Sequence, residues 1–487
     1  MFKKFRKSLS EFLSRLVQAS AELGSLYSSD LLMTVQAWVV AMSSSQLRSF
    51  RHTATVIALE IETALCEVAA KVVKEAEVIS RQREGERKRR GKGSGTSREK
   101  DLEVKAKEVN DRRAKLDEFL KEFFDGYVRK AIISQLRFIS YFRVFIHRYR
   151  DLDPSIRAEC VQALGNWLKK FPAHYLDGQY LRYIGWVLSD TVTSVRLEAV
   201  RALVALYSHD DFIVSLQSFT DRFKPRLLEM ASGDTDYAVR VAAVQVLSDV
   251  DAHGLLEEDQ RSQLCLLVFD ADVRVRRAVG GFVHGVWREA REQRLVGKKR
   301  ATDIETDRAG LKALAQLLVQ WNRQLDNVSA EQENGFDGES SSQGDGPSVS
   351  RNEVSEALAA QQKSRIASAV EALWDEVPAI SDWEAMLDLL LLDHSAGTEA
   401  SHNGSPVSAR RKKAKKVIDD VVVDEAWRLE EAEEATLLEV LVTALRKAKA
   451  EAGTGKKVQD HQNAIDVYTE VSDRARRKRC LPILPVL

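Results

Sequence analysis

The sequence has few residues that break helices. Only 8 prolines and 24 glycines occur in 487 residues, whereas an average protein has about 5% proline and 7% glycine. A chain of β-strands needs frequent turns, so this scarcity argues against an all-β fold. The composition favours long helices instead, and 44% hydrophobic residues are enough to form packed cores.

The sequence patterns of common chemical sites are also missing. The four cysteines form no CxxC pair, which excludes a zinc ribbon and makes a disulfide framework implausible, so a reducing intracellular compartment is expected. No HExxH, GxSxG or complete phosphate-loop pattern occurs, so we expect neither an enzyme nor a bound metal or cofactor. No run reaches the roughly 18 apolar residues that a membrane span requires, so no membrane partner is expected.

The charges balance, with 73 basic and 73 acidic side chains. Any nucleic-acid binding must therefore come from local basic patches. One such patch is Arg87, Lys88, Arg89 and Arg90, for which the charge run alone favours a solvated hairpin tip and leaves phosphate contact open. The second is RRKKAKK at 410–416, for which we favour a nuclear localisation signal over DNA contact.

Helical periodicity covers the N-terminal region. Apolar residues at spacings of three and four predict one helix face, made of Phe5, Leu9, Phe12, Leu13, Leu16 and Val17. Asp30 is placed to cap the next helix, whose expected apolar face is Leu31, Leu32, Val35, Trp38 and Val39. The charged stretch 81–121, broken by glycine and serine, predicts a long helical hairpin with a mobile tip.

An internal repeat spans residues 144–290. Four segments carry an aspartate followed by a β-branched residue and an arginine, and these arginines are Arg157, Arg196, Arg240 and Arg276. Periods near 40 residues are typical of HEAT-type helical pairs, which stack into a solenoid because one pair cannot bury its own apolar face. The repeated aspartates Asp151, Asp190, Asp234 and Asp270 are expected to cap the second helix of each pair. An irregular helical bundle is the alternative.

Composition divides the chain into segments. In chain order we expect an N-terminal helical region with the basic hairpin (1–127), an inserted segment (128–143), the repeat array (144–290) and a helical stretch (291–324). A flexible linker (325–352), more helix (353–393), a flexible basic segment (394–416), a last helix (417–450) and an irregular tail (451–487) should follow.

Three strips of the repeat region resemble one known family. VFIHRYRD near residue 144, YLRYIGW near 180 and SFTDRF near 218 occur in the order found in the stromalin conservative domain of the stromal-antigen subunits of cohesin. FRKSLSEFLSRLV at 5–17 and LWDEVPAISDWEAMLDLLL at 373–391 are similar to further parts of that family. The segment 128–143 and the ending RKRCLPILPVL are out of the family's pattern, and we interpret the former as a possible retained intron and the chain as partial.

The resemblance implies an all-α, HEAT-repeat scaffold with defined partners. These are the kleisin subunit of cohesin, other cohesin ring subunits, double-stranded DNA, and cohesin regulators that carry Phe/Tyr motifs, at the chromosome in the nucleus. The residues that match the family's peptide-binding surface are Tyr149, Tyr183, Trp186, Arg222 and Phe223. From the residues alone, packing between repeats is the favoured role of Trp186, and the resemblance favours the surface role instead. The resemblance also implies that the N-terminal hairpin lies near the DNA, which favours phosphate contact for Arg87, Lys88, Arg89 and Arg90. A HEAT-type nuclear adaptor or transport scaffold without DNA contact remains the alternative function.

Overall fold

The computed structural model describes residues 2–90, 97–124, 144–296, 302–334, 365–392, 394 and 424–452. Over these residues every regular element is a helix and none is a strand, so the all-α prediction is confirmed. The chain divides into two compact units, Met1–Leu256 and Glu257–Leu487. No helix among the described residues is both long and apolar enough to cross a membrane.

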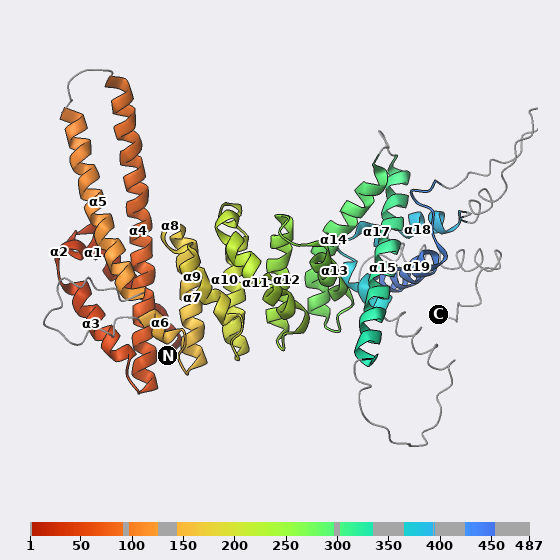
Figure 1. Cartoon of the computed structure of the whole chain (residues 1–487), viewed down its shortest axis with the longest axis horizontal. Helices are drawn as coiled ribbons and strands as arrows, with labels where there is room; N and C mark the ends of the chain where they lie inside the picture. The colour runs from red at the N-terminus through yellow and green to blue at the C-terminus, as the bar shows by residue number, and fades with distance from the viewer. Residues whose placement is uncertain are drawn as a thin grey trace, which may run out of the picture. The chain divides into compact units, whose positions relative to one another are not determined.

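The first unit begins with helices gathered around one long helix. They are α1 (Phe2–Glu22), α2 (Ser25–Ser28), α3 (Leu31–Ser43), α4 (Arg48–Arg90) and α5 (Ser97–Phe124). Helices α4 and α5 pack along each other as the predicted hairpin (Figure 1), and α1 and α3 both pack on α4. Asp30 does precede α3, but its side chain makes no capping hydrogen bond.

The repeat region of this unit is a two-layered array. Its helices are α6 (Val144–Arg148), α7 (Pro154–Lys170), α8 (Pro172–Tyr175), α9 (Gly178–Val187), α10 (Thr193–Tyr207), α11 (Ile213–Gly233) and α12 (Tyr237–Ala252), with a 3-10 turn at Asp210–Phe212. Helices α7, α10 and α12 pack in succession, while α9 packs on α11 (Figure 1). Small residues permit this approach, since a Cβ on Gly165 would lie 2.6 Å from the Cβ of Ala202. The HEAT-like stacking is therefore confirmed.

The expectation that the repeated aspartates cap their helices is wrong. An N-cap residue must directly precede the first helical residue, and the repeated aspartates lie two positions too early. The N-cap positions are Asp153, Val192, Asp236 and Asp272. Each repeated aspartate instead stabilises the turn, as where the Asp190 carboxylate accepts a hydrogen bond from the Val192 N–H at 2.9 Å.

The same aspartates link consecutive repeats through the repeated arginines. The Arg157 guanidinium donates to both carboxylate oxygens of Asp190 at 2.8 Å. Arg196 binds Asp234 in the same bidentate way, at 2.7 and 2.8 Å. The Arg196 and Asp234 side chains are only 9% and 2% exposed, so this ladder lies inside the array. The repeated Asp/Arg pattern thus encodes contacts between repeats.

Helix α4 joins the N-terminal helices to the array. Its Thr63 hydroxyl accepts a hydrogen bond from the Trp167 indole of α7 at 2.8 Å. At the preceding residue of α4, the hydroxyl of Tyr175 donates to Oε1 of Glu62 at 2.5 Å. Glu62 is 1% exposed and its Oε2 has no hydrogen-bond partner among the described residues. Burial raises the pKa of the Glu62 carboxyl well above its usual range, an effect that the Tyr175 hydroxyl only partly offsets.

The second unit is a helical cluster. It comprises α13 (Glu258–Cys265), a 3-10 turn (Leu266–Phe269), α14 (Val273–Leu295), α15 (Asp303–Asn334), a helix over 365–373, α17 (Pro378–Ser381), α18 (Trp383–Leu390) and α19 (Glu431–Ala452). Helix α15 packs against α14, α18 and α19. A buried ion pair between Lys312 and Glu433 joins α15 to α19.

Two helix bounds differ from those predicted. Helix α15 continues to Asn334, ten residues into the expected linker 325–352, because no glycine or proline interrupts the sequence before Gly335. Helix α19 begins at Glu431, not at 417, and its Glu433 carboxylate accepts a hydrogen bond from the Glu430 N–H.

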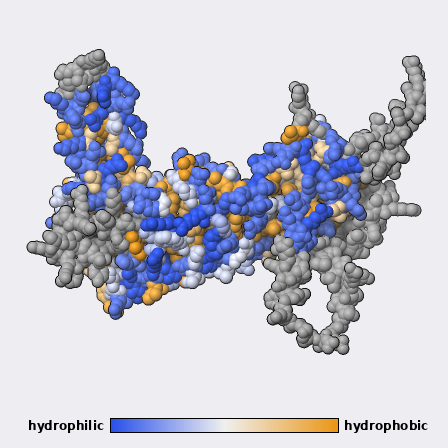
Figure 2. Space-filling model, in the orientation of Figure 1, coloured by the Kyte–Doolittle hydropathy of each residue, from blue (hydrophilic) through white to orange (hydrophobic). Residues whose placement is uncertain are grey.

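The segments 128–143, 410–416 and the tail after 452 lie outside the described residues, so the proposed insertion and localisation signal stay predictions. Figure 2 shows a mainly hydrophilic face with scattered hydrophobic residues.

Candidate peptide-binding surface

Helix α9 presents Trp186 at the surface of the array. Asp177 caps the helix by accepting the Gln179 N–H. Tyr183 and Val187, on the face that packs inward, are buried, whereas Trp186 is 41% exposed. The helix therefore holds one large aromatic ring at the boundary between core and solvent.

The two predicted tyrosines lie beneath this tryptophan. Tyr149 and Tyr183 are 4% and 5% exposed and meet edge to face, with ring centroids 4.9 Å apart. Tyr183 meets Trp186 in the same manner at 5.4 Å. Edge-to-face contacts of this kind stabilise an aromatic cluster beyond its buried area. Tyr149 and Tyr183 thus support the Trp186 ring from below and expose little surface of their own.

Phe223 reaches the same place from α11. A Cβ on Gly185 would lie 2.2 Å from the ζ carbon of the Phe223 ring, so only glycine permits this contact. Phe223 also packs on Phe219, with ring centroids 4.8 Å apart. The Phe223 ring therefore lies against Gly185, the residue that directly precedes Trp186 in α9.

Three exposed arginines surround the two rings. The guanidinium carbons of Arg150 and Arg182 lie 5.7 and 5.6 Å from the Trp186 ring centroid, and that of Arg222 lies 5.3 Å from the Phe223 ring. Cation–π contacts at such distances orient a guanidinium while leaving N–H groups free for an acceptor. Arg150 and Arg182 were missed at the sequence level, although Arg182 precedes Trp186 by one helical turn and Arg150 lies in the HRYRD strip.

The arrangement combines apolar and acceptor-binding groups. Exposed aromatic faces can bind an aromatic side chain of a partner, and the arginines can bind a carboxylate or a main-chain carbonyl beside it. Burial raises the pKa of Tyr149, with Arg150 opposing that rise, so its phenol stays neutral at physiological pH. Among the described residues there is no cluster of side chains that could hold a metal ion.

The basic cluster lies elsewhere on the first unit. Arg87 and Lys88 are exposed near the end of α4, and Lys88 pairs with Glu84 at 2.7 Å. Arg89 and Arg90 belong to the same helix, but their side chains are outside the described residues. Glu86 pairs with Arg98 across the hairpin at 3.4 Å. At 1.5 Å per residue, Arg87 lies about 30 Å along α4 from Glu67, which contacts α7.

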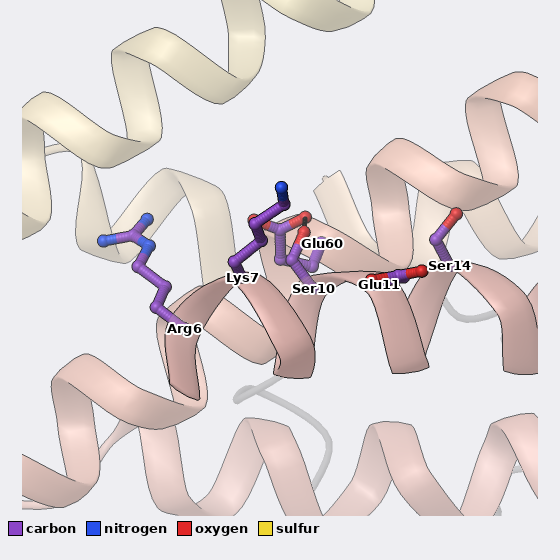
Figure 3. Close-up of a pocket in the computed structure, with 6 residues that line it drawn as sticks. All are labelled: Arg6, Lys7, Ser10, Glu11, Ser14 and Glu60. Carbon is purple, nitrogen blue, oxygen red and sulfur yellow. Dashed lines mark hydrogen bonds between the residues drawn. The ribbon is translucent and has the colours of Figure 1, made fainter. Parts of the chain in front are cut away.

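A polar hollow lies between α1 and α4 (Figure 3). Ser10 donates a hydrogen bond to Glu60 at 2.6 Å, and Lys7 lies beside them in Figure 3. Arg6 points away from the other residues drawn and binds both carboxylate oxygens of Glu159, at 2.5 and 2.8 Å. The hollow mixes both signs of charge, so it indicates no particular ligand.

Comparison with known proteins places these features in two domain families. Residues 1–105 match the STAG domain and 150–224 match the stromalin conservative domain. The basic cluster thus lies in the first, and Trp186 with Phe223 in the second.

Several cohesin subunits are similar to this chain. Cohesin subunit psc3 of Schizosaccharomyces pombe is 36% identical over 57% of this chain and 27% of its own length. Cohesin subunit SA-1 of Xenopus laevis is 27% identical over 100% of this chain and 32% of its own. The chain therefore spans about a third or less of these relatives.

A solved structure supports the fold. Cohesin subunit Scc3 from Z. rouxii superposes with a TM-score of 0.63 at 18% identity, over 93% of this chain and 46% of the other. At this identity the likeness concerns the helical solenoid alone. With both diagnostic domains in order and cohesin subunits as its relatives, the chain belongs to the stromalin family.

Proposed function

We propose that the chain is a non-enzymatic scaffold of the cohesin complex in the nucleus. It binds kleisin, and through kleisin the other ring subunits, together with double-stranded DNA and regulator peptides. The observation that carries the proposal is the exposed Trp186, flanked by Arg150 and Arg182 and adjacent to Phe223. It lies in the domain that this chain shares with cohesin subunits.

The peptide surface suits a short segment with an aromatic residue next to an acidic one. The aromatic residue packs on Trp186 and Phe223, while an acidic group or carbonyl pairs with Arg222. Aromatic anchors commonly dominate the binding energy of such interfaces. A partly exposed tryptophan surrounded by arginines is the expected form of such an anchor before the peptide arrives.

Trp186→Ala tests this role. Removing a central aromatic anchor typically costs about 2 kcal/mol or more, so a fluorescent Phe/Tyr peptide with an acidic neighbour should bind at least about tenfold more weakly in fluorescence anisotropy. Leu152→Ala is the control, because Leu152 is 95% exposed and outside the surface. Unchanged peptide affinity, or loss of the helical circular dichroism signal, would assign Trp186 to the core instead.

The basic cluster suits phosphate contact. Arg87 and Lys88 are exposed, and the ion pair between Lys88 and Glu84 is solvent-exposed on both sides, so it competes weakly with a phosphate. Contacts of this kind carry no sequence code. Duplex binding should therefore be independent of sequence and weaken with salt by a slope of about 0.9 per phosphate neutralised.

Replacing Arg87, Lys88, Arg89 and Arg90 together with alanine tests this contact. The slope of the logarithm of the binding constant against that of salt concentration should fall by about two to four units. Trp186→Ala is the matched control and should leave the slope unchanged. An unaltered slope in the alanine variant would leave the cluster as a solvated hairpin tip and favour an adaptor without DNA contact.

Kleisin binding is proposed for the conservative domain and is tested by hydrogen exchange of the whole chain. A kleisin fragment should slow amide exchange within residues 144–247, because an interface excludes water and suppresses local opening. Slowed exchange confined to residues after 257 would contradict this placement while leaving the peptide and DNA proposals standing.

A further inference from the structure

Exposed apolar side chains concentrate at the N-terminal end of the first unit. Phe5 and Phe12 of α1 are 64% and 60% exposed, and Trp38 of α3 is 67% exposed. The sequence pattern predicts all three on helix faces that should be buried, yet of those faces the core contains other residues, namely Leu13, Val17, Leu32 and Val39. Large apolar side chains left exposed in one region of a protein are a common feature of interaction sites.

The exposed residues extend a crevice between the two helices. Its lining is entirely apolar except for one serine, and consists of Leu16, Val17, Ser20, Leu26, Leu31, Leu32, Val35 and Ile61. Leu16 lies four residues after Phe12, and Val35 lies three residues before Trp38, so each pair shares a helix face. The apolar surface therefore runs from the crevice outward along both α1 and α3.

The crevice is too small for a ligand molecule. Its free volume of about 20 Å³ holds roughly one water or methyl group. What fits is the methyl end of one side chain of a larger partner, while the partner covers the exposed rings. From Phe5 to Leu16 the surface follows eleven residues of α1, or about 17 Å, which is three turns of a helix laid alongside.

The charged residues of α1 favour a partner helix with acidic flanks. Helix α1 carries five basic residues against two acidic ones, and α3 carries no charged residue. Lys4 is exposed and has no ion-pair partner within the described part of the chain. Arg15 is exposed as well, held only by a solvent-exposed pair with Glu11. Such a border favours acidic residues on the flanks of the incoming helix.

We infer that the surface between α1 and α3 binds an amphipathic helix of a partner protein, about three turns long, with an apolar stripe and acidic flanks. The stripe presents residues at i, i+3, i+4 and i+7, as helices seated in apolar grooves do. This surface shares no residue with the Trp186 surface or with the basic cluster.

The test uses the whole chain and three synthetic peptides of about 16 residues. The first has leucines at i, i+3, i+4 and i+7 with glutamates between them. The second has lysines in place of the glutamates, and the third has the first composition in scrambled order. Fluorescence anisotropy should show binding of the first peptide only, weakened at least about tenfold by Trp38→Ala or Phe12→Ala. Val214→Ala, at a position 83% exposed on α11, should leave that affinity unchanged.

Three outcomes would overturn the inference. Equal affinity for the scrambled peptide, or affinity unaffected by Trp38→Ala, would remove the amphipathic helix as the occupant. Tighter binding of the lysine peptide would refute the charge argument. A chain that is dimeric by sedimentation, and monomeric after Trp38→Ala, would assign the surface to a second copy instead. Because Trp38 and Phe12 are largely exposed, these variants are expected to keep the helical signal of the parent chain.

Discussion

Replacing Glu62 by glutamine should stabilise the protein at neutral pH. The carboxyl is buried between α4 and α8, one oxygen accepts the Tyr175 hydroxyl, and the other has no partner among the described residues. Burial raises the pKa of Glu62 well above its usual range, so the folded protein keeps a proton that the unfolded chain releases near pH 4.3. The protein therefore loses stability as the pH rises from about 4.3 toward the raised pKa of Glu62, by at most about 1.4 kcal/mol per pH unit.

Glu62→Gln removes that dependence while keeping an acceptor for Tyr175. The free energy of unfolding, from guanidinium titrations at pH 5, 6 and 7, should therefore favour the variant increasingly with pH, with a slope of at most about 1.4 kcal/mol per pH unit. Glu67→Gln is the control on the same helix, since Glu67 is partly exposed and pairs with Lys170 at 2.5 Å, so its loss should not stabilise at any pH. A Glu62→Gln variant that is equally destabilised at every pH would show that Glu62 is a charged acceptor.

Two further substitutions test the array itself. Gly185→Ala should displace the Phe223 ring, which should cost about 1–3 kcal/mol of stability in thermal melts and weaken peptide binding in fluorescence anisotropy. Gly178→Ala on the same helix is the control, because a Cβ there meets open space, and it should change neither quantity. Removing Arg196 alone should cost about 3–5 kcal/mol, since it leaves the buried carboxylate of Asp234 unpaired, and a double-mutant cycle with Asp234→Asn should give a coupling of about 0.5–3 kcal/mol. Burial raises the pKa of Asp234, but Arg196 and the Asp236 N–H lower it overall, so this stability is present above about pH 3.9 and is lost as acid protonates the carboxylate.

Periodicity and composition were sufficient for the fold class, because helix faces and a repeated Asp/Arg pattern are local signals. The role of the aspartates was not predictable in the same way. Asp190 and Asp234 pair with arginines 33 and 38 residues earlier. The residue pattern of a single helix does not indicate which residue of another repeat it contacts. The exposure of Trp38 was missed for a related reason, since an apolar residue at helical spacing indicates a face without showing what covers it.

The candidate surface was predicted only in part. Resemblance supplied Trp186 and Phe223, but Tyr149 and Tyr183 proved to be buried supports. Arg182 was available from its spacing to Trp186, four residues in one helix. The contact of Gly185 with Phe223 joins α9 to α11, and only the packed structure reveals that this glycine is what lets the Phe223 ring lie against α9 beside Trp186.

Helix α4 explains how one chain can keep its proposed binding surfaces separate. Its first half carries Glu62, Thr63 and Glu67, whose contacts fix the helix to α7 and α8. Its last turns carry Arg87 and Lys88, about 30 Å further along a continuous helix. Sites that far apart with no shared contacts act almost independently. The proposed phosphate contact of the hairpin and the proposed peptide contact of the conservative domain are therefore compatible with each other, because the buried contacts around Glu62 hold α4 against α7 and α8.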